Sequence, residues 1–422
     1  MEYKKLKELA TISISNVDKK TTNNEKPVKL CNFVEVYRNW AITERMIPNL
    51  MIASAKEAEI EKYSLHKGDV CITKDSETKD DIGMSTYIAD DIEDLVLGYH
   101  CALLSPKKEV LDGKYLNAFL QTDFVRRFYE HNASGSGQRY TLSLDTIGDI
   151  PIPAIPLEEQ KKKGRLLSLI DRKIENNNKI NDNLQQQLRL IYNQWFIQCK
   201  PVSYSNGTMN NRLHWDNYLM RNVPNDWPLK SLSEIGTIVC GGTPSTAHPE
   251  YYAEKGIAWV TPNDLSSNSH NIFINHGARD ISQEGLNNSS ATLMPAGSIL
   301  LSTRAPIGYI AISETDVCTN QGFKSVVADK GVGSAYIYFT LLDMTPRILH
   351  LGAGTTFMEV SKDSISSLKV LCPPAHIINA FCCVVEPLMK KCSDCQNEIK
   401  KLLSLRNFLL PLLMSGQATI TD

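Results

Sequence analysis

One pattern of residues occurs twice along this chain, and this repeat constrains the possible fold more than any other feature. Each copy places a turn glycine before a short apolar strand that ends on a hydroxyl, around Gly68 and again around Gly297. Further landmarks follow in the same order: an Ile-Gly pair (82–83 and 307–308), a strand after a glycine (98 and 322), an aromatic helical stretch (115–129 and 336–349), a glycine loop (135–140 and 352–357) and a proline-led helix (156 and 374). Because the order holds throughout, we interpret the chain as two copies of one folding unit.

Each copy is predicted to be a mixed α/β globular domain followed by one long helix. The 422 residues would allow two or three domains at about 150 residues each. The segment between the two copies is rich in asparagine and other polar residues, as a linker would be. The predicted division is a first globular domain at 1–156, a helix at 157–199, a linker at 200–227, a second globular domain at 228–373 and a helix at 374–415.

The two long helices carry a heptad pattern. Their apolar positions step alternately by four and three residues, which is the spacing of a coiled-coil seam. The predicted seam consists of Ile170, Ile174, Asn177, Asn181, Leu184, Leu188, Ile191 and Trp195 in the first helix, and of Leu388, Cys392, Cys395, Ile399, Leu402, Arg406, Leu409 and Leu413 in the second. Pro387 and Pro411 should kink the second helix or interrupt it near its ends.

The connectivity predicts that these helices pair antiparallel. The first helix ends where the second domain begins, and the second helix starts where that domain ends. If both ends of the second domain lie together, the second helix runs back along the first. About 40 residues per helix would then form a rod of roughly 60 Å with a globular domain at each end.

Composition indicates a globular protein of a reducing compartment. Hydrophobic residues make up 42% and charged residues 22%, and no apolar run approaches the roughly 20 residues that span a bilayer. The N-terminus has no secretory pattern, and the 11 cysteines are an odd number, so we expect a cytoplasmic protein without disulfides. The formal net charge of −2 gives no sign of nucleic-acid binding at the level of totals.

Catalytic patterns are weak throughout the sequence. There is no phosphate-binding Gly-x-x-x-x-Gly-Lys-Ser/Thr loop, and the glycines at 352 and 354 lack the third glycine of a cofactor loop. Cys392 and Cys395 have no second ligand pair and sit at helical core spacing, which favours a structural role over zinc. We therefore predict a non-catalytic chain that binds no metal or cofactor itself.

Hydrogen-bonding and cationic side chains at predicted strand ends and turns are the candidate binding residues. Arginine can contact guanine, asparagine or glutamine adenine, and hydroxyls either base or phosphate. The candidates are Arg38, Thr73, Lys74, Gln138, Arg139 and Tyr140 in the first copy, and Thr243, Ser245, Thr261, Asn263, Ser302, Thr303, Arg304, Gln321 and Lys324 in the second. Ordinary turn chemistry explains any single one of them at least as well. The basic run 161–165 could be a solvated helix face or follow a phosphate backbone.

The sequence resembles the DNA-specificity subunit of type I restriction–modification enzymes. The resemblance rests on the duplicated plan and on several stretches in a fixed order. These are the segment before the first long helix (150–160), two segments within that helix (169–177 and 192–196), the start of the second domain (227–232 and 241–245) and the end of the second helix (412–417). The second junction, which reads Pro-Pro-Ala-His-Ile-Ile at 373–378, departs from the pattern because it lacks the Glu-Glu-Gln that ends the first.

The resemblance implies two target recognition domains, each reading one half of a bipartite site in double-stranded DNA. It also implies that the helices set the spacing of the half-sites and dock two methyltransferase (modification) subunits, which restriction (translocase) subunits join. S-adenosylmethionine, ATP and Mg²⁺ are then expected on those partners. Half-site centres read from one face of DNA would lie about 34 Å apart. A non-enzymatic coiled-coil scaffold with peptide- or protein-binding end domains is the alternative.

Overall fold

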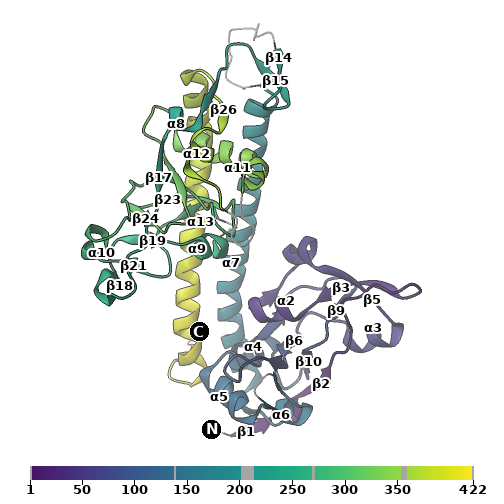
Figure 1. Cartoon of the computed structure of the whole chain (residues 1–422). Coiled ribbons are helices and arrows are strands. Elements are labelled where there is room, and N and C mark those ends of the chain that lie inside the picture. The colour runs from purple at the N-terminus through teal and green to yellow at the C-terminus, as the bar shows by residue number, and fades with distance from the viewer. Residues whose placement is uncertain (1, 137–138, 201–212, 269–270, 353–358, 421–422) are drawn as a thin grey trace. The chain divides into compact units, whose positions relative to one another are not determined.

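The computed structural model of this chain describes residues 2–136, 139–200, 213–268, 271–352 and 359–420. The chain forms two compact units: unit 1 comprises Met1–Lys179 and Glu398–Asp422, and unit 2 comprises Ile180–Asn397. Each unit takes part of the two long helices, α7 (Leu157–Tyr192) and α13 (Ala375–Met414) (Figure 1). The units therefore do not follow the predicted division, which set the helices apart from the globular domains.

Unit 1 is built on a five-stranded sheet in the order β2-β10-β6-β8-β4. Its strands are β2 (Ala10–Ile14), β10 (Cys101–Pro106), β6 (Val70–Thr73), β8 (Ser85–Ile88) and β4 (Ala41–Ile42). All neighbours pair antiparallel except β4 and β8, which are parallel. Strand β1 (Tyr3–Lys5) pairs antiparallel with β13 (Pro151–Pro153) and so joins the two ends of the globular part.

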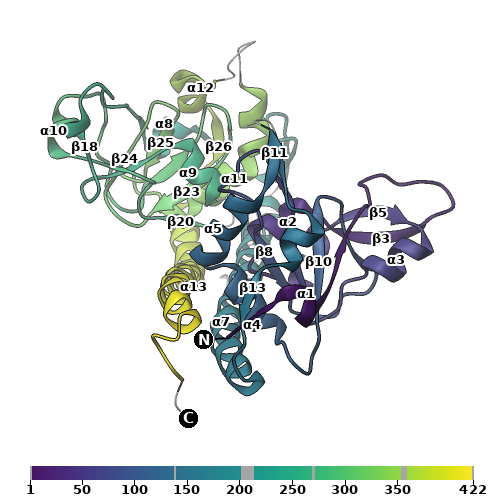
Figure 2. The ribbon, with the colours of Figure 1, turned by 90° about the horizontal axis from the view of Figure 1, so that it is seen from below.

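Two smaller sheets complete the strands of unit 1. One has the order β5-β3-β9, with β5 (Met51–Ala55), β3 (Lys26–Cys31) and β9 (Leu95–Leu97). With α3 (Glu57–Tyr63), strands β3 and β5 lie on the side of unit 1 away from α7 (Figure 2). The other has the order β11-β12-β7, with β11 (Ser134–Ser136), β12 (Arg139–Thr141) and β7 (Asp75–Ser76).

Short helices cover the sheets of unit 1, and the helix near the C-terminus closes its core. The helices are α1 (Leu6–Leu9), α2 (Phe33–Arg38), the 3₁₀ helix η1 (Glu44–Asn49), α4 (Gly113–Leu120), α5 (Asp123–Asn132) and α6 (Leu144–Gly148). Leu410, Leu413 and Met414 of α13 are buried in the same cluster as Ile72 and Tyr115. The first unit is thus built from both ends of the chain.

Unit 2 repeats the topology of the five-stranded sheet. Its five-stranded sheet has the order β17-β25-β22-β23-β20, again with a parallel pair, β20 and β23, at one edge. The strands are β17 (Thr237–Cys240), β25 (Lys324–Val327), β22 (Ile299–Leu301), β23 (Ile310–Ser313) and β20 (Phe273–Ile274). Strands β16 (Leu229–Ser231) and β26 (Lys369–Leu371) pair as β1 and β13 do. The predicted repeat is therefore confirmed.

The turn glycines that revealed the repeat have the backbone conformation that requires glycine. Gly68 and Gly297 have φ values of 106° and 84°, and Gly83 and Gly308 have φ values of 78° and 93°. A side chain at these φ values is strained, so glycine is the residue that fits. The glycine loops themselves lie partly outside the described residues, at 137–138 and 353–358.

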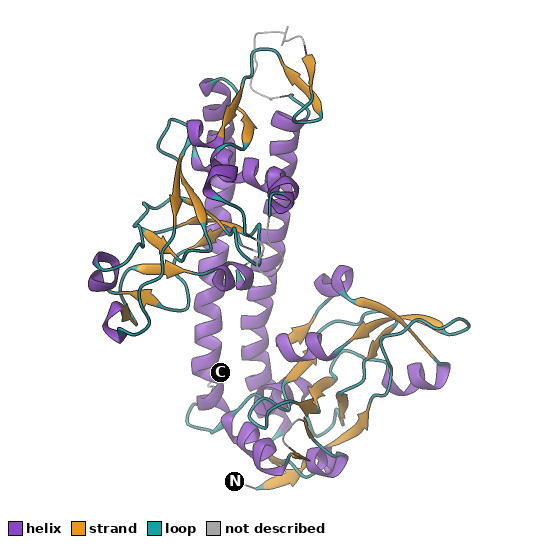
Figure 3. Ribbon diagram, viewed as in Figure 1, coloured by secondary structure: helices purple, strands orange, loops and turns teal. Residues whose placement is uncertain are grey.

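The remaining elements of unit 2 surround its sheet (Figure 3). They are α8 (Leu232–Ile235), the 3₁₀ helix η3 (Pro249–Tyr251), β18 (Tyr252–Ala253), β19 (Ala258–Val260), α9 (Pro262–Ser267), β21 (Asp280–Ile281), α10 (Gln283–Asn287), β24 (Val317–Thr319), α11 (Ser334–His350) and α12 (Lys362–Ser366). Strands β14 (Leu213–Asp216) and β15 (Arg221–Pro224) form a hairpin inside the segment predicted to be a linker. Cross-strand pairing therefore orders part of a segment whose polar composition predicted none.

The two long helices pair antiparallel, as predicted. Within unit 1, Asp171 bonds Arg406 at 2.9 Å while Asn177, further along α7, donates to Glu398 at 2.8 Å. The contacts thus move forward along α7 and backward along α13. Within unit 2, Trp195 and Phe196, in the π-helical turn η2 (Asn193–Ile197) that follows α7, contact the ring of Phe381 of α13 in tilted and edge-on orientations.

Every predicted seam residue is buried or half-buried, so the heptad pattern located the contact face of both helices. Helix α13 runs through Pro387 and Pro411 without interruption, so the predicted breaks are excluded. Both prolines are exposed, which lets water bond the carbonyls that lose an amide partner. No helix in the described part of the chain is long and apolar enough to cross a membrane.

Candidate nucleic-acid interface

The central strand of each five-stranded sheet ends with the same hydrogen bond, from a backbone amide of the following turn to a side-chain hydroxyl. The hydroxyl of Thr73, at the end of β6, accepts the amide of Met84 at 3.1 Å. The hydroxyl of Ser302, after β22, accepts the amide of Tyr309 at 2.9 Å. Both hydroxyl residues are completely buried. The hydroxyl that ends each strand in the sequence pattern therefore holds the turn to the next strand and does not face solvent.

Backbone hydrogen bonds continue this match beyond the strand ends. The amide of Lys74 donates to His100 at 2.9 Å, and that of Thr303 donates to Gly322 at 2.7 Å. On the other side, Leu142 donates to Lys74 at 2.8 Å and Val360 donates to Thr303 at 2.9 Å. Cross-strand pairing then places Asp75 opposite Thr141 in unit 1 and Arg304 opposite Glu359 in unit 2. Asp75 and Arg304 thus occupy equivalent positions with opposite charge.

In unit 1, Asp75 is the centre of a cluster of basic groups. Its carboxylate accepts Lys74 at 2.8 Å and Arg139 at 3.2 Å, and lies 2.5 Å from His100 Nδ1. Burial raises the pKa of Asp75, but hydrogen bonds from Lys74, Thr141 and His100 outweigh burial and bring the pKa down to about 2. The carboxylate is buried, whereas 60% of the Arg139 side chain is exposed. The cluster therefore presents a fixed guanidinium at the surface.

In unit 2 the acid and the base exchange strands. Glu359 accepts Arg304 Nε at 2.8 Å and Lys324 Nζ at 3.2 Å. Partial burial raises the pKa of Glu359, but hydrogen bonds from Arg304 and Lys324 outweigh it and hold the pKa below its usual value. The Arg304 side chain is 46% exposed. Both units thus end their central strand in an ion cluster with one exposed arginine and one buried or half-buried carboxylate.

A cleft of about 450 Å³ opens beside Arg304. Four predicted residues line it: Thr261, Asn263, Arg304 and Gln321. Thr261 is fixed as the N-cap of α9 through its hydrogen bond to Asp264, and Gln321 accepts the hydroxyl of Thr243. The structure therefore gathers four of the predicted residues into one polar recess, with Thr243 bonded to one of them.

Other predicted residues do not join these sites. Thr73, Ser302 and Thr303 are completely buried, and the hydroxyls of Thr73 and Ser302 bond within the fold, as does that of Thr303 to Gly322 at 3.2 Å. Ser245 is exposed but outside the lining of the cleft, and Arg38 lines a different cleft, in unit 1. Gln138 lies outside the described residues.

The remaining predicted residues belong to the clusters or lie near them. Lys324 and Lys74 contribute charge from largely buried positions, and Tyr140 is half-buried with the Lys79 ammonium over its ring at 5.3 Å.

The basic run at 161–165 is mostly explained by local pairing. Lys161 lies 2.8 Å from Glu158, and the buried Lys163 lies 2.8 Å from Glu159. The neighbouring Gln160 is also buried: it accepts the amide of Asp112 at 3.0 Å and donates to Val110 and Ile155 at 3.0 Å each. The hydrogen bonds of Gln160, in the Glu-Glu-Gln segment, therefore connect the first turn of α7 to the globular part of unit 1.

The cysteines form no metal site in the described part of the chain, where no cluster of metal-binding side chains occurs. Cys392 and Cys395 are buried in α13, and burial raises the pKa of Cys392 to about 11. A thiol with such a pKa is a poor nucleophile and metal ligand. Sequence reasoning missed Asp75, His100 and Glu359, although aligning the two copies beyond Thr73 and Ser302 would have shown the reversed charge.

These features define a class of molecule: a duplicated α/β protein with two different polar strand-end sites and a pair of antiparallel helices. The family model described as type I restriction modification DNA specificity domain matches residues 1–186 and 224–404. The two matches cover most of the chain and correspond to the two copies. The chain therefore belongs to the type I restriction–modification DNA-specificity family.

Individual relatives agree with this assignment. The MjaIX specificity subunit of Methanocaldococcus jannaschii is 34% identical over 195 residues, which span 44% of this chain and 44% of that protein. The HindI specificity subunit of Haemophilus influenzae is 24% identical over 410 residues, covering 84% of this chain and 88% of the relative. The S subunit of a type I system from M. genitalium shares the fold, with a TM-score of 0.58, 14% identity and coverage of 97% and 95% of the two chains.

Proposed function

We propose that this chain is the non-catalytic DNA-specificity subunit of a type I restriction–modification complex and that each unit reads one half of a bipartite, asymmetric DNA site. The family assignment favours this function over a coiled-coil scaffold with peptide-binding ends. The observation that carries the proposal is that the five-stranded sheets of the two units have the same topology, whereas the exposed polar residues at their strand ends differ.

The strand-end clusters supply groups suited to duplex DNA. Arg139 and Arg304 are each held by a carboxylate at one side, so their guanidinium groups are oriented while part of each side chain stays exposed. An oriented arginine can bond a phosphate or the edge of guanine. In unit 2, Asn263 and Gln321 stand in the same recess as Arg304, and amide side chains can bond adenine. Different donors in the two units predict two different half-sites.

The long helices are proposed to set half-site spacing and to dock two methyltransferase subunits, which restriction subunits then join. Exposed apolar residues on the helix pair of unit 1 support this role: Leu169 on α7 and Leu405 and Phe408 on α13 are 53%, 44% and 65% exposed. Apolar groups left in water are typical of a protein–protein interface. S-adenosylmethionine, ATP and Mg²⁺ would be bound by those partner subunits.

Mapping methylated adenines in cells with and without this gene tests the proposal. Loss of methylation from one bipartite sequence when the gene is deleted is the expected result, and an unchanged methylation pattern would contradict it. A binding measurement complements the map: affinity for duplex DNA, with methyltransferase subunits present, should fall steeply between about 50 and 200 mM salt if several phosphates are neutralised. Absence of duplex binding in that complex would exclude the proposed function.

A further inference from the structure

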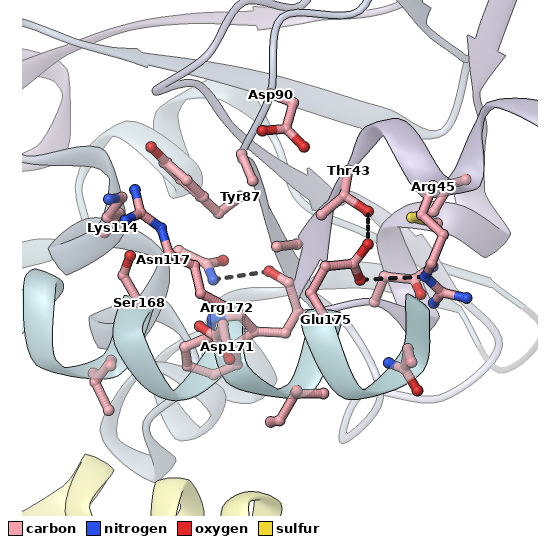
Figure 4. A pocket seen from close by; sticks show the side chains of 18 of the residues that line it. Thr43, Arg45, Tyr87, Asp90, Lys114, Asn117, Ser168, Asp171, Arg172 and Glu175 are labelled. Atoms are coloured by element: carbon pink, nitrogen blue, oxygen red, sulfur yellow. Dashed lines mark hydrogen bonds and ion pairs between the residues drawn. The ribbon is translucent and has the colours of Figure 1, made fainter. Parts of the chain in front are cut away.

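A cleft of about 420 Å³ in unit 1 is separate from the strand-end cluster (Figure 4). Its lining comes from α7, from the loops and strands around β4 and β8, from the start of α4 and from α13. Seven basic and three acidic side chains line it; the basic ones are Arg38, Arg45, Lys67, Lys114, Arg172, Lys179 and Arg406, and the acidic ones Asp90, Asp171 and Glu175. The cleft therefore carries an excess of positive charge.

The three acids are already bound to donors of unit 1. Asp171 accepts Arg406 at 2.9 Å, and Glu175 accepts Thr43 at 3.1 Å and Arg45 at 3.3 Å. Asp90 accepts the backbone amide of Glu44 at 3.2 Å. Each carboxylate is thus already engaged by a donor of unit 1, as the dashed contacts of Glu175 in Figure 4 show.

Three other cations of the lining have no such partner. Among the residues that the structure describes, the side chains of Lys67, Lys114 and Arg172 form no hydrogen bond and no ion pair, and Lys114 only contacts the ring of Tyr87, at 5.9 Å. Burial lowers the pKa of Lys114, and the nearby positive charges of Arg172 and Lys67 lower it further, against the opposing effect of Asp112 and Asp171. Unpaired cations that repel one another mark a place where an anion would be stabilised.

A nearly buried hydroxyl completes this group of donors. Tyr87 is 8% exposed, and its hydroxyl has no hydrogen-bond partner among the described residues although it lies in the cleft beside Lys114 and Arg172 (Figure 4). Because Tyr87 lines the cleft, its hydroxyl is available to a ligand that enters there. The hydroxyl of Ser168, on α7, also faces this cleft.

We propose that Lys67, Lys114, Arg172 and the Tyr87 hydroxyl form a binding site for a phosphate group. The four donors come from four separate parts of the fold: the turn before β6, β8, α4 and α7. Gly164 in α7 permits their approach, because a Cβ there would lie 2.6 Å from Asp112 and 3.1 Å from Lys114. Two sources share this chemistry, a phosphate of the DNA backbone and a free phosphate compound. Binding of a DNA phosphate rests on the proposed function, whereas binding of a free phosphate compound does not.

The first arm of the test measures pyrophosphate binding to the full chain by isothermal titration calorimetry at constant ionic strength. Lys114→Met keeps the aliphatic stem without the charge, and Tyr87→Phe removes only the hydroxyl. Each is expected to weaken binding about tenfold, the usual effect of losing one charge-assisted bond. Lys108→Met, at an exposed position outside the cleft, is the matched control and should bind as the wild type does. Circular dichroism confirms that each variant is folded.

The second arm measures duplex DNA binding by the same proteins as a function of salt. If backbone phosphate is the source, Lys114→Met weakens DNA binding and reduces the salt slope by about 1, as expected for one lost phosphate contact. If a free phosphate compound is the source, pyrophosphate binding changes and the DNA slope does not. Wild-type behaviour of Lys114→Met and Tyr87→Phe in both arms would overturn the site. Pyrophosphate binding by a chain that binds no DNA would keep the site and exclude the proposed function instead.

Discussion

Equivalent positions in the two units carry opposite charges on the same backbone frame. Asp75 and Arg304 are each the second residue after the hydroxyl that ends the central strand, and each faces the strand that follows the glycine loop. In unit 1 the acid is Asp75, in β7 just after the central strand, whereas in unit 2 it is Glu359 on the facing segment. The acid and the arginine thus exchange places between the two units. The ion cluster is preserved, but the exposed arginine lies at a different position, so one fold can present different hydrogen-bond donors.

The ion cluster of unit 1 predicts a pH-dependent contribution to stability. The pKa of Asp75 is about 2 in the folded chain, below the ordinary 3.8, so its contribution is complete above about pH 4 and is lost as the pH falls toward 2. Asp75→Asn should lower the free energy of unfolding by about 1–3 kcal/mol at pH 7 and by much less at pH 2. Urea unfolding at both pH values measures this. Asp80→Asn, at an exposed position, is the control, and an equal loss at both pH values would contradict the prediction.

Arg304 is predicted to contribute directly to DNA binding. Arg304→Ala should weaken binding, or relax one half-site, by about 1–3 kcal/mol. Glu359→Gln is the matched variant, because it retains the arginine and removes a negative charge, and it should not weaken binding. Fluorescence anisotropy with duplex DNA at one fixed salt concentration compares them. Wild-type affinity of Arg304→Ala would show that the residue only completes an ion pair.

Single residues show where sequence reasoning succeeds and where it fails. The turn glycines Gly68 and Gly297 were predictable, because the turn at each position requires a positive φ and this requirement depends only on the neighbouring backbone. The carboxylates Asp75 and Glu359 were missed, because their partners lie up to 64 positions away and no spacing rule connects them. Ser302 and Thr303 were predicted to bind DNA as turn hydroxyls, whereas in the structure they are buried and shape the turn.

At the scale of elements, the close approach of α7 to α4 depends on Gly164. A Cβ at this position would lie 2.6 Å from Asp112 Oδ1 and 3.2 Å from the Tyr115 amide. Asp112 caps α4 by accepting that amide at 2.9 Å, so it cannot move aside without loss of the cap. Gly164→Ala should therefore destabilise unit 1 by about 1–3 kcal/mol, although alanine is the better helix former by about 1 kcal/mol.

Urea unfolding tests this prediction against a neighbour. Arg165→Ala changes the adjacent, exposed position of α7 and should alter the free energy of unfolding by less than about 0.5 kcal/mol. Stabilisation by Gly164→Ala would show that helix propensity decides the effect and that the two helices are not in contact there.

The seam of α7 is predicted to matter for assembly as well as for stability. Leu184 is half-buried against the core of unit 2, so Leu184→Asp should cost about 2–4 kcal/mol of helix packing. We expect both units to stay folded while half-site spacing or subunit docking changes. Methylation mapping detects a change in spacing, and Gln186→Asp on the exposed face is the control. Wild-type spacing and docking in Leu184→Asp would argue against a spacer role.

Periodicity predicted the long elements better than the short ones. The heptad pattern located α7 and α13 within a few residues, because a buried seam must recur every three or four positions. The hairpin of β14 and β15 was predicted as linker, since its strands expose apolar Leu213 and Trp215 and show no buried face in the sequence. Pro387 and Pro411 suggested breaks, but exposed prolines remove only bonds that water can replace.

At the scale of the whole chain, the order of landmarks sufficed to predict a duplicated fold. Order survives differences in loop length, whereas individual residue matches do not. The phosphate cleft could not be predicted, since Lys67, Lys114 and Arg172 come from three elements that only the tertiary fold of unit 1 brings together. The strand-end recess of unit 2 was found residue by residue but not as one site.

The C-terminal part of α13 belongs to the first unit, and this makes a prediction across the chain. Leu413 is 2% exposed in the core of unit 1, so Leu413→Asp should destabilise unit 1 by about 2–5 kcal/mol while unit 2 is unaffected. Hydrogen–deuterium exchange should show lost protection within residues 2–179. Leu405→Asp, at an exposed position of the same helix, is the control. Equal loss of protection in both units would contradict the division.

The same division sets an order for biosynthesis. A nascent chain emerges with residues 1–179 first, yet the leucines and methionine that close their core lie at 410–414. The second unit, by contrast, is one continuous stretch from Ile180 to Asn397, and all of it is translated before the residues that close the first unit. The unit translated first therefore finishes folding last, and until residues 410–414 emerge its exposed core is the part of the chain that most needs chaperones.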